Sequence, residues 1–373
     1  MEKRKFRELS SEEQTLVVEQ YNKNVPLKRI FEEFNLKGSH GFLYLDFPPT
    51  PTGSNCLHCG EPLMCKPIHR TVGKRDTDVY CPKCGHLPEY SYCDCDHCEE
   101  NRRKIRAQKQ KMIADTYTKR IQSVDFVDLS TSEKVYLAVA FRMLQRDETY
   151  EYFLLNWGRG MTPTSDMDRK LLQKLIDSHC FAVSPNADIE AFVEDHRFPY
   201  VYDPRRVKLW LTVESLGDEF ETKLKLFDPD RTTFEKKELL KLWYEVGAQE
   251  CLGYTLYVNE ETWNVPSTVG CEKVFTELLE DFSICQVFQI IQLALTRPIY
   301  LDESDLIYSD YERTWLPRQI NHYARKARLG TLKLNGLRRP DDYEVSELTY
   351  YLFNKATLLG ERGFTMSPSL SLL

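Results

Sequence analysis

Cys56-Leu57-His58-Cys59-Gly60 and Cys81-Pro82-Lys83-Cys84-Gly85 are two copies of one short pattern, and they decide how the middle of this chain folds. Two cysteines separated by two residues present two thiolates to a metal ion from one tight turn. The glycine after each second cysteine suits a backbone position that needs a positive φ. Two such turns together complete a tetrahedral zinc site.

The paired turns resemble the zinc knuckles of zinc-ribbon (rubredoxin-like) domains. The resemblance covers only residues 54–90 or so, and the two patterns at 56–85 carry it. It implies that one structural Zn²⁺ binds the thiolates of Cys56, Cys59, Cys81 and Cys84.

A second group of cysteines lies in and after the same stretch, at Cys65, Cys93, Cys95 and Cys98. A second all-cysteine zinc site is the simplest interpretation, which gives two structural Zn²⁺ ions. The histidines between the cysteines could each replace one of them: His58, His69, His86 and His97. The ligands could also be shared crosswise between the turns. Disulfides or free thiols are the alternative, but clustered C-x-x-C turns in a reducing compartment more often bind metal.

Zinc sites with four cysteine ligands are usually structural, because catalytic zinc keeps one position open for water. The cluster therefore explains how residues 54–98 fold without a large apolar core, and it names no reaction. Such modules most often recognise nucleic acid and sometimes protein. The four remaining cysteines are each surrounded by apolar residues and are predicted to be buried: Cys180, Cys251, Cys271 and Cys285.

Composition limits the possible classes of protein. The chain has 373 residues, enough for two or three domains, and 42% of them are hydrophobic, enough for a packed core. A net charge of −7 argues against a protein that coats nucleic acid along its whole surface. The longest apolar run is too short for a membrane span, and Met1–Lys5 leads into polar sequence, so we expect a soluble cytoplasmic protein without membrane contact.

Residues 1–47 are predicted to form a helical hairpin. Ser10 and Glu13 form a capping box before the first helix, and Pro26 starts the second. Residues 10–45 resemble a helix-turn-helix of the transposase and resolvase class, which implies phosphate contacts from Lys28 and Arg29. The recognition helix would have to be residues 38–45, and its internal glycine leaves few side chains for base reading. The alternative is a plain helical hairpin that packs on the zinc module.

Residues 48–54, rich in proline, are predicted to be a linker into the zinc module at 54–98. Residues 99–122 follow as a long helix, since they contain neither glycine nor proline. This helix is densely basic in an acidic chain, and its cations could neutralise phosphates with little sequence preference. The basic residues are Arg102, Arg103, Lys104, Arg106, Lys109 and Lys111. The alternative is a solvated connecting helix.

Residues 124–373 are predicted to form a larger, mostly helical domain with a possible subdivision near residue 204. Within it we expect a strand or an extended segment over Cys251–Asn259 and one long helix over Cys271–Leu295. A further basic cluster near the end of the chain is predicted to be solvated helix ends rather than a phosphate-binding surface: Arg325, Lys326, Arg328, Arg338 and Arg339. No catalytic residues are predicted.

The sequence thus predicts a mainly α protein with minor β, in which a small zinc module lies between a helical hairpin and a larger helical domain. Our leading hypothesis is a zinc-containing nucleic-acid-binding protein, possibly a regulator, with double-stranded DNA as its first candidate partner. The competing hypothesis is a scaffold subunit that docks a protein through the zinc module. A third is an enzyme whose active site lies unrecognised in the C-terminal domain.

Overall fold

The computed structural model describes residues 3–154, 160–214, 234–262, 267–297 and 308–373. The predicted fold class, mainly α with minor β, is confirmed. The chain divides into two compact units, unit 1 over residues 1–109 and unit 2 over residues 110–373. The hairpin and the zinc module both lie in unit 1, and each unit is described by itself.

Unit 1 begins with the predicted helical hairpin, α1 (Ser11–Asn22) and α2 (Leu27–Glu33). The predicted capping box is present, since the Glu13 N–H donates to Ser10 Oγ at 3.2 Å and the Ser10 N–H donates to the Glu13 carboxylate at 2.8 Å. A short 3₁₀ helix, η1 (Phe6–Glu8), packs onto the pair. The hairpin has its own small apolar core, which includes Val17, Tyr21, Ile30, Phe31 and Phe47.

The element at the position of a recognition helix is a 3₁₀ helix, η2 (His40–Asp46). Leu43 points into the hairpin core, whereas Phe42 and Leu45 are 63% and 59% exposed. Its poorer hydrogen-bond geometry agrees with the internal glycine seen in the sequence. Within residues 38–46, the structure therefore has no α-helix that could serve as the recognition helix of a helix-turn-helix.

The zinc module is built on a three-stranded antiparallel sheet in the order β1 (Thr50–Asn55), β2 (Pro62–Cys65) and β3 (Val79–Tyr80). The prediction of a linker over residues 48–54 was wrong for most of its length, because β1 pairs with β2 there. Pro51 is tolerated since β1 is an edge strand, where a missing N–H breaks no central ladder.

Arg70 joins the zinc module to the hairpin inside unit 1. Its guanidinium donates to the Val25 carbonyl at 2.8 Å and lies 5.2 Å from the ring centroid of Tyr21. The ring of His69 packs edge-on against Tyr44 at 5.0 Å. These contacts favour one folded body over two loosely connected modules.

The predicted basic helix is present as α3 (Asp96–Thr118). Its first turns belong to unit 1, and residues 97–108 are mostly exposed. Its last turns belong to unit 2, where Ile113 and Tyr117 join the main core. The helix is thus covalently continuous between the metal-binding stretch and the larger unit.

Unit 2 contains a four-stranded antiparallel sheet in the order β5-β6-β8-β7. Its strands are β5 (Leu144–Arg146), β6 (Tyr152–Leu154), β7 (Phe181–Val183) and β8 (Leu209–Leu211). A separate parallel pair joins β4 (Val124–Asp125) to β9 (Val213–Glu214).

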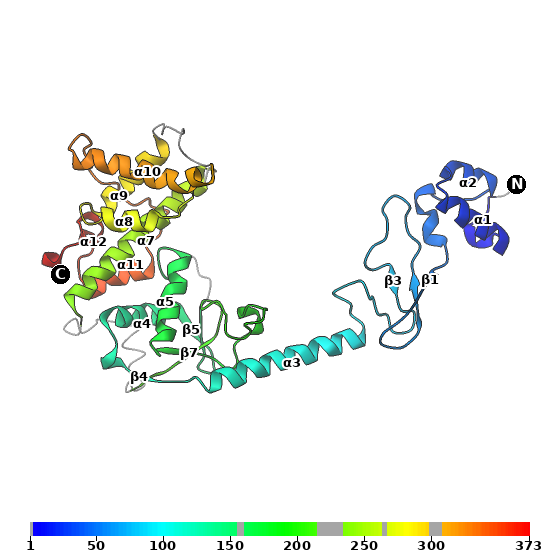
Figure 1. The fold of residues 1–373 in the computed structure, drawn as a ribbon, viewed down its shortest axis with the longest axis horizontal. Helices are drawn as coiled ribbons and strands as arrows, with labels where there is room; N and C mark the ends of the chain where they lie inside the picture. The colour runs from blue at the N-terminus through cyan, green and yellow to red at the C-terminus, as the bar shows by residue number, and fades with distance from the viewer. Residues whose placement is uncertain (1–2, 155–159, 215–233, 263–266, 298–307) are drawn as a thin grey trace. The chain divides into compact units, whose positions relative to one another are not determined.

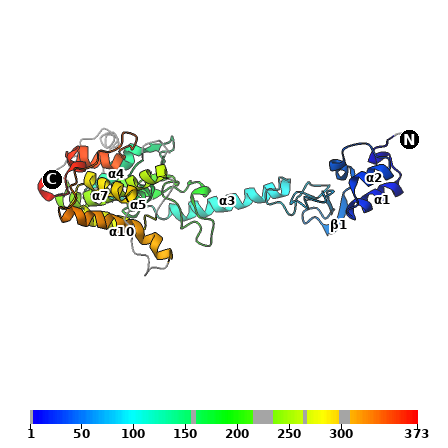
Figure 2. The same cartoon turned by 90° about the horizontal axis from the view of Figure 1, so that it is seen from above.

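Helices make up most of unit 2, with α4 and α5 near the sheet and the later helices gathered beyond them (Figure 1). Helix α10 runs beside α9 (Figure 1), and the second view shows α10 along one edge of unit 2 (Figure 2). The α-helices are α4 (Thr131–Met143), α5 (Ser165–Asp177), α7 (Lys236–Thr262), α8 (Cys271–Leu278), α9 (Ile284–Thr296), α10 (Tyr308–Arg328), α11 (Glu347–Tyr351) and α12 (Arg362–Thr365). Shorter turns are η3 (Phe126–Asp128), η4 (Ile189–Ala191), the π-helical η6 (Leu352–Ala356) and η7 (Leu370–Leu372). One apolar core extends from Ile113 to Phe364 and joins the regions on both sides of residue 204.

Two secondary-structure predictions in unit 2 were wrong. Residues 251–259 are not a strand but the last part of α7, because Tyr254 stacks on Phe288 with 4.0 Å between the ring centroids and packing outweighs strand propensity. Residues 271–295 are two helices rather than one. Ser283 begins α9 with a capping box to Gln286, and this S-x-x-Q signal was present in the sequence.

Helix α7 packs closely against the backbone of Pro163 at Gly253. A Cβ atom at this position would lie 2.7 Å from the Pro163 carbonyl oxygen, which is backbone and cannot easily move. We predict that Gly253→Ala destabilises the protein by about 1–3 kcal/mol, although alanine is the better helix former. At Gly247 the nearest atom would be the end of the Leu279 side chain, which can move. Gly247→Ala is therefore the control, and urea unfolding should show a smaller loss there.

Candidate metal centres

The first metal centre is the group Cys56, Cys59, Cys81 and Cys84, whose sulfur atoms all lie within 4.8 Å of one another. The Sγ–Sγ distances are 3.4 Å between Cys59 and Cys81, 3.6 Å between Cys56 and Cys84, and 3.7 Å between Cys59 and Cys84. Zn–S bonds of about 2.3 Å in a tetrahedron give sulfur–sulfur edges of about 3.8 Å. The four thiols therefore have the spacing that a tetrahedral metal ion requires.

The two knuckles that present these thiols have the same backbone construction. The Gly60 N–H donates to the Cys56 carbonyl at 2.9 Å, and the Gly85 N–H donates to the Cys81 carbonyl at 3.0 Å. Both glycines have positive φ, 75° and 71°, as the pattern predicted. The apolar support below them is small and consists mainly of Leu63 and Val79.

The second knuckle favours a thiolate at one position and a thiol at the other. Burial opposes ionisation of Cys81, but the N–H groups of Cys84 and Lys83 and the neighbouring thiols outweigh it and lower its pKa to about 7. Burial and the thiols of Cys81 and Cys56 raise the pKa of Cys84 to about 12. A bound cation would favour the thiolate at all four positions, because a metal ligand must be deprotonated.

A second group of donors lies beside the first and consists of His58, His86, Cys95 and Cys98, again within 4.8 Å of one another. Cys93 also lies beside this group, because its Sγ is 3.6 Å from His86 Nδ1. Thus five donor side chains meet where a tetrahedral ion would need four. The donors are soft thiolates and imidazoles, which suit zinc rather than magnesium or calcium.

Several predicted ligands can now be placed. Cys93, Cys95 and Cys98 are brought together, but Cys65 is in neither group and its Sγ contacts the Lys66 carbonyl oxygen at 3.4 Å. Of the interleaved histidines, His58 and His86 reach the second group. His86 directly follows the second knuckle in the pattern Cys-x-x-Cys-Gly-His. This pattern is the sequence signal that would have favoured His86 over the other histidines as a ligand.

The remaining sulfur chemistry agrees with the sequence analysis. All twelve cysteines are free thiols, so the cluster is not a disulfide framework in this structure. The four scattered cysteines are buried as predicted: Cys180, Cys251, Cys271 and Cys285.

The predicted phosphate-contacting residues are solvent-facing, and many of them have an acidic neighbour. Lys28 and Arg29 are exposed on α2, with the Lys28 ammonium 4.0 Å from Glu32. On α3, Arg103 pairs with Glu99 at 2.5 Å and Lys104 pairs with Glu100 at 3.3 Å. Arg106 and Lys111 are exposed, and Lys109 is half-buried.

Arg102 has a structural role in the metal-binding stretch. Its Nη1 donates to the Cys93 carbonyl at 2.6 Å, and its Nη2 lies 3.5 Å from Asp94. This guanidinium therefore holds the loop that carries Cys93 and Cys95 against the start of α3. A substitution of Arg102 would disturb the second centre as well as any phosphate contact.

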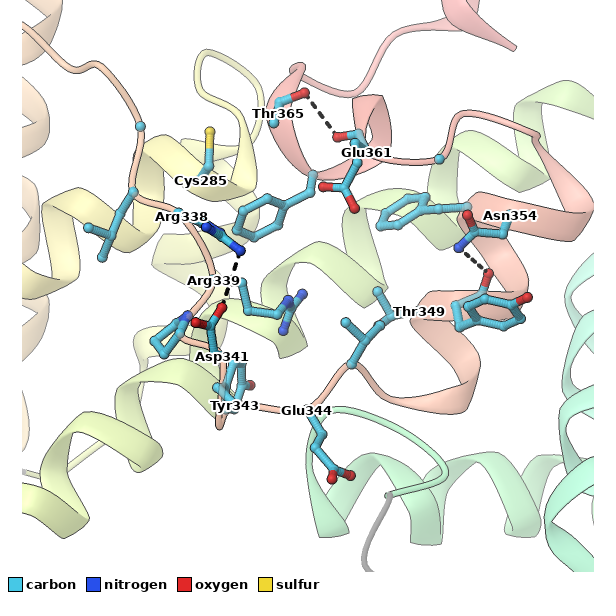
Figure 3. A pocket seen from close by; sticks show the side chains of 18 of the residues that line it. Cys285, Arg338, Arg339, Asp341, Tyr343, Glu344, Thr349, Asn354, Glu361 and Thr365 are labelled. Carbon is cyan, nitrogen blue, oxygen red and sulfur yellow. Dashed lines mark hydrogen bonds and ion pairs between the residues drawn. The ribbon is translucent and has the colours of Figure 1, made fainter.

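Unit 2 has a cavity of about 690 Å³ that is lined by α9, α11, η6, α12 and the segment 335–345 (Figure 3). Its central cation, Arg339, pairs with buried Glu250 at 2.8 Å and lies within 5.0–5.8 Å of the Phe288, Tyr343 and Phe364 ring centroids. Arg338 pairs with Asp341 at 3.2 Å (Figure 3). These charges are balanced internally, and Arg328 likewise pairs with Asp281 at 2.7 Å. The prediction of solvated helix ends was therefore wrong for Arg338 and Arg339, because both lie outside any helix and Arg339 is held in the cavity by Glu250. The ion pairs do not favour a phosphate-binding surface here.

Comparisons with known protein families, with curated proteins and with solved structures found no match to this chain. The metal centres therefore stand on the donor geometry alone. Among the helices that the structure describes, not one combines the length and the apolar character needed to cross a bilayer.

Metal removal should unfold the zinc module selectively. We predict that EDTA exposes residues 54–98 to protease while unit 2 keeps its helical circular dichroism, because the unit 2 core contains none of the candidate ligands. In the purified chain, Cys81→Ser should lower the zinc content measured by atomic emission, since it removes a donor from the first centre. Cys65→Ser is the matched control and should retain the full content. A loss of zinc in Cys65→Ser would contradict the placement of this cysteine outside both centres.

Proposed function

We propose that this chain is a zinc-containing nucleic-acid-binding protein that contacts the phosphates of double-stranded DNA through the N-terminal hairpin and the basic helix α3. The observation that carries the proposal is the row of exposed cations on the first turns of α3, beside the second metal centre. The chain as a whole is acidic, with a net charge of −7, so a basic row on one helix is a local feature. Cations placed on a rigid helix can neutralise phosphates and release counterions.

The acidic neighbours of these cations do not prevent such binding. Arg103 and Glu99 are 71% and 50% exposed, and ion pairs at this exposure contribute only about 0–1 kcal/mol. A phosphate can therefore replace the carboxylate as the partner of the cation. Lys104 and Lys111 lie seven residues apart, so they share one side of the helix at a separation of about 10 Å along its axis.

The hairpin would contribute phosphate contacts rather than base reading. Lys28 and Arg29 are exposed on α2, and Arg70 attaches the hairpin to the zinc module. The 3₁₀ helix η2 offers a short apolar surface where a recognition helix would read base edges. We therefore propose binding with little sequence preference.

A protein-docking function is the second candidate, and it has an observation of its own. Leu57 at the tip of the first knuckle is 92% exposed, and Tyr92 is 72% exposed. Exposed tyrosine side chains such as Tyr92 are enriched at the energetically important positions of protein interfaces. Such a complex would tolerate salt, because apolar burial is not screened by ions.

The acidic partners allow a test in which the sign of the effect is predicted. We expect that Arg103→Gln with Lys104→Gln and Lys111→Gln weakens duplex DNA binding and lowers the slope of log K against log salt by about 3. Glu99→Gln with Glu100→Gln should tighten binding about 2- to 10-fold, because each change removes an ion pair that competes with phosphate. Fluorescence anisotropy at several salt concentrations measures both effects.

The control is Lys236→Gln with Lys237→Gln, two exposed lysines of α7 in unit 2, which should leave the affinity and the salt slope unchanged. Zinc content is measured on each variant to show that the metal centres are retained. If the wild-type chain does not bind duplex DNA even at low salt, the proposal fails and protein docking becomes the better account.

A further inference from the structure

Five side chains compete for the four positions of a tetrahedral ion at the second metal centre. They are His58, His86, Cys93, Cys95 and Cys98. The sequence suggested Cys65 as the fourth ligand, and the structure does not bring it there. The distances between the donor atoms can identify which four side chains bind.

His86 has the spacing of a ligand to all three cysteines. Its Nδ1 lies 3.6 Å from Cys93 Sγ, 3.6 Å from Cys95 Sγ and 3.4 Å from Cys98 Sγ. Zn–N bonds of about 2.0–2.1 Å and Zn–S bonds of about 2.3 Å give a nitrogen–sulfur edge of about 3.6 Å in a tetrahedron. All three distances therefore match the nitrogen–sulfur edges of one tetrahedral site, in which the His86 nitrogen is one ligand and the three cysteine sulfurs are the others.

The burial and hydrogen bonding of Cys93 are those expected of a metal ligand, whereas the surroundings of His58 are those expected of a residue outside the coordination sphere. Cys93 is 2% exposed, and its sulfur accepts a hydrogen bond from the Leu87 N–H at 3.2 Å, a contact that stabilises a thiolate. His58 is exposed, and its Nε2 lies 3.8 Å from Cys98. Its ring is stacked on His97 at 4.9 Å with an interplanar angle of 16°. His58 thus has another partner, while Cys93 faces the cluster.

We propose that the second centre binds Zn²⁺ through His86 Nδ1 and the thiolates of Cys93, Cys95 and Cys98, and that its loading is coupled to that of the first centre. Both knuckles of the first centre lie against the second. His86 is two residues after Cys84, and its carbonyl accepts the Cys81 N–H at 2.8 Å. An ion at the first centre fixes this knuckle and so places the His86 imidazole for the second ion. The proposal does not depend on nucleic-acid binding.

The ligand set is tested with Co²⁺, whose visible absorption reports tetrahedral thiolate coordination, and with Zn²⁺ competition on the full chain. His86→Ala and Cys93→Ser should each weaken the second site at least about 100-fold, more than the loss of an outer-shell partner causes. His58→Ala is the matched control and should leave two ions bound, with a loss of second-site affinity that stays below the limit of about 100-fold for an outer-shell partner. Retention of a Co²⁺ spectrum from the first centre shows that the module of the weakened variants still folds.

Two outcomes would overturn the assignment. If His58→Ala loses the second ion while Cys93→Ser keeps it, then the ligands are His58, His86, Cys95 and Cys98. If the wild-type chain binds a single ion under saturating Zn²⁺, then the second centre does not exist as a metal site.

Coupling between the two centres predicts equal changes in metal affinity at both, which a general loss of folding would not produce. Cys59→Ser disables the first centre and Cys95→Ser disables the second. Linkage requires the affinity lost at the second site in Cys59→Ser to equal the affinity lost at the first site in Cys95→Ser, and we expect about 5- to 150-fold for both. Unchanged affinities would show that the centres are independent, and clearly unequal losses would show that the substitutions act by local misfolding; either result contradicts the coupling.

Discussion

The arrangement of four thiols around one point, at Cys56, Cys59, Cys81 and Cys84, is the constraint on which residues 54–98 of unit 1 depend. The strands that carry these cysteines are short, and the apolar cluster beneath them is formed largely by Leu63 and Val79. Burial of so little apolar surface cannot offset the entropy lost when some forty residues are ordered. A metal ion bound by the four thiols would add folding free energy that this apolar cluster does not supply, because a site that is absent from the unfolded chain couples metal binding to folding.

The same constraint organises the neighbouring parts of the chain. The second knuckle ends at Gly85, and the next residue contributes the imidazole around which Cys93, Cys95 and Cys98 gather. Cys98 lies in the first turn of α3, so the cluster also fixes where that helix starts. Arg102 reinforces the start from the helix side through the Cys93 carbonyl. The clustering of donor side chains, the order of the loop and the start of the helix are therefore parts of one arrangement.

The sequence predicted those features that depend on local chemistry. The knuckle glycines, the capping box at Ser10 and the uninterrupted basic helix all follow from a few adjacent residues, and they are confirmed. Two of the failures involve long-range contacts, whereas the break before α9 had a local signal, the Ser283 capping box, that the prediction missed. Residues 251–259 contain good strand formers, but the stacking of Tyr254 on Phe288 keeps them helical. Cys65 has the right chemistry for a ligand, yet its position in β2 keeps it outside both groups, which no spacing rule reveals.

The charges on α3 show why a basic run in a sequence is weak evidence by itself. Arg102 is committed to the fold, whereas Arg103 and Lys104 face carboxylates one turn away on the solvent side. The i,i+4 spacing of Glu99 with Arg103 and of Glu100 with Lys104 stabilises an exposed helix by only a few tenths of a kcal/mol per pair. Each such pair therefore adds only a little stability to this exposed helix. A polyanion can displace the carboxylates from the cations at a small cost in free energy. The same side chains can therefore stabilise the helix in the free protein and remain available to a phosphate backbone.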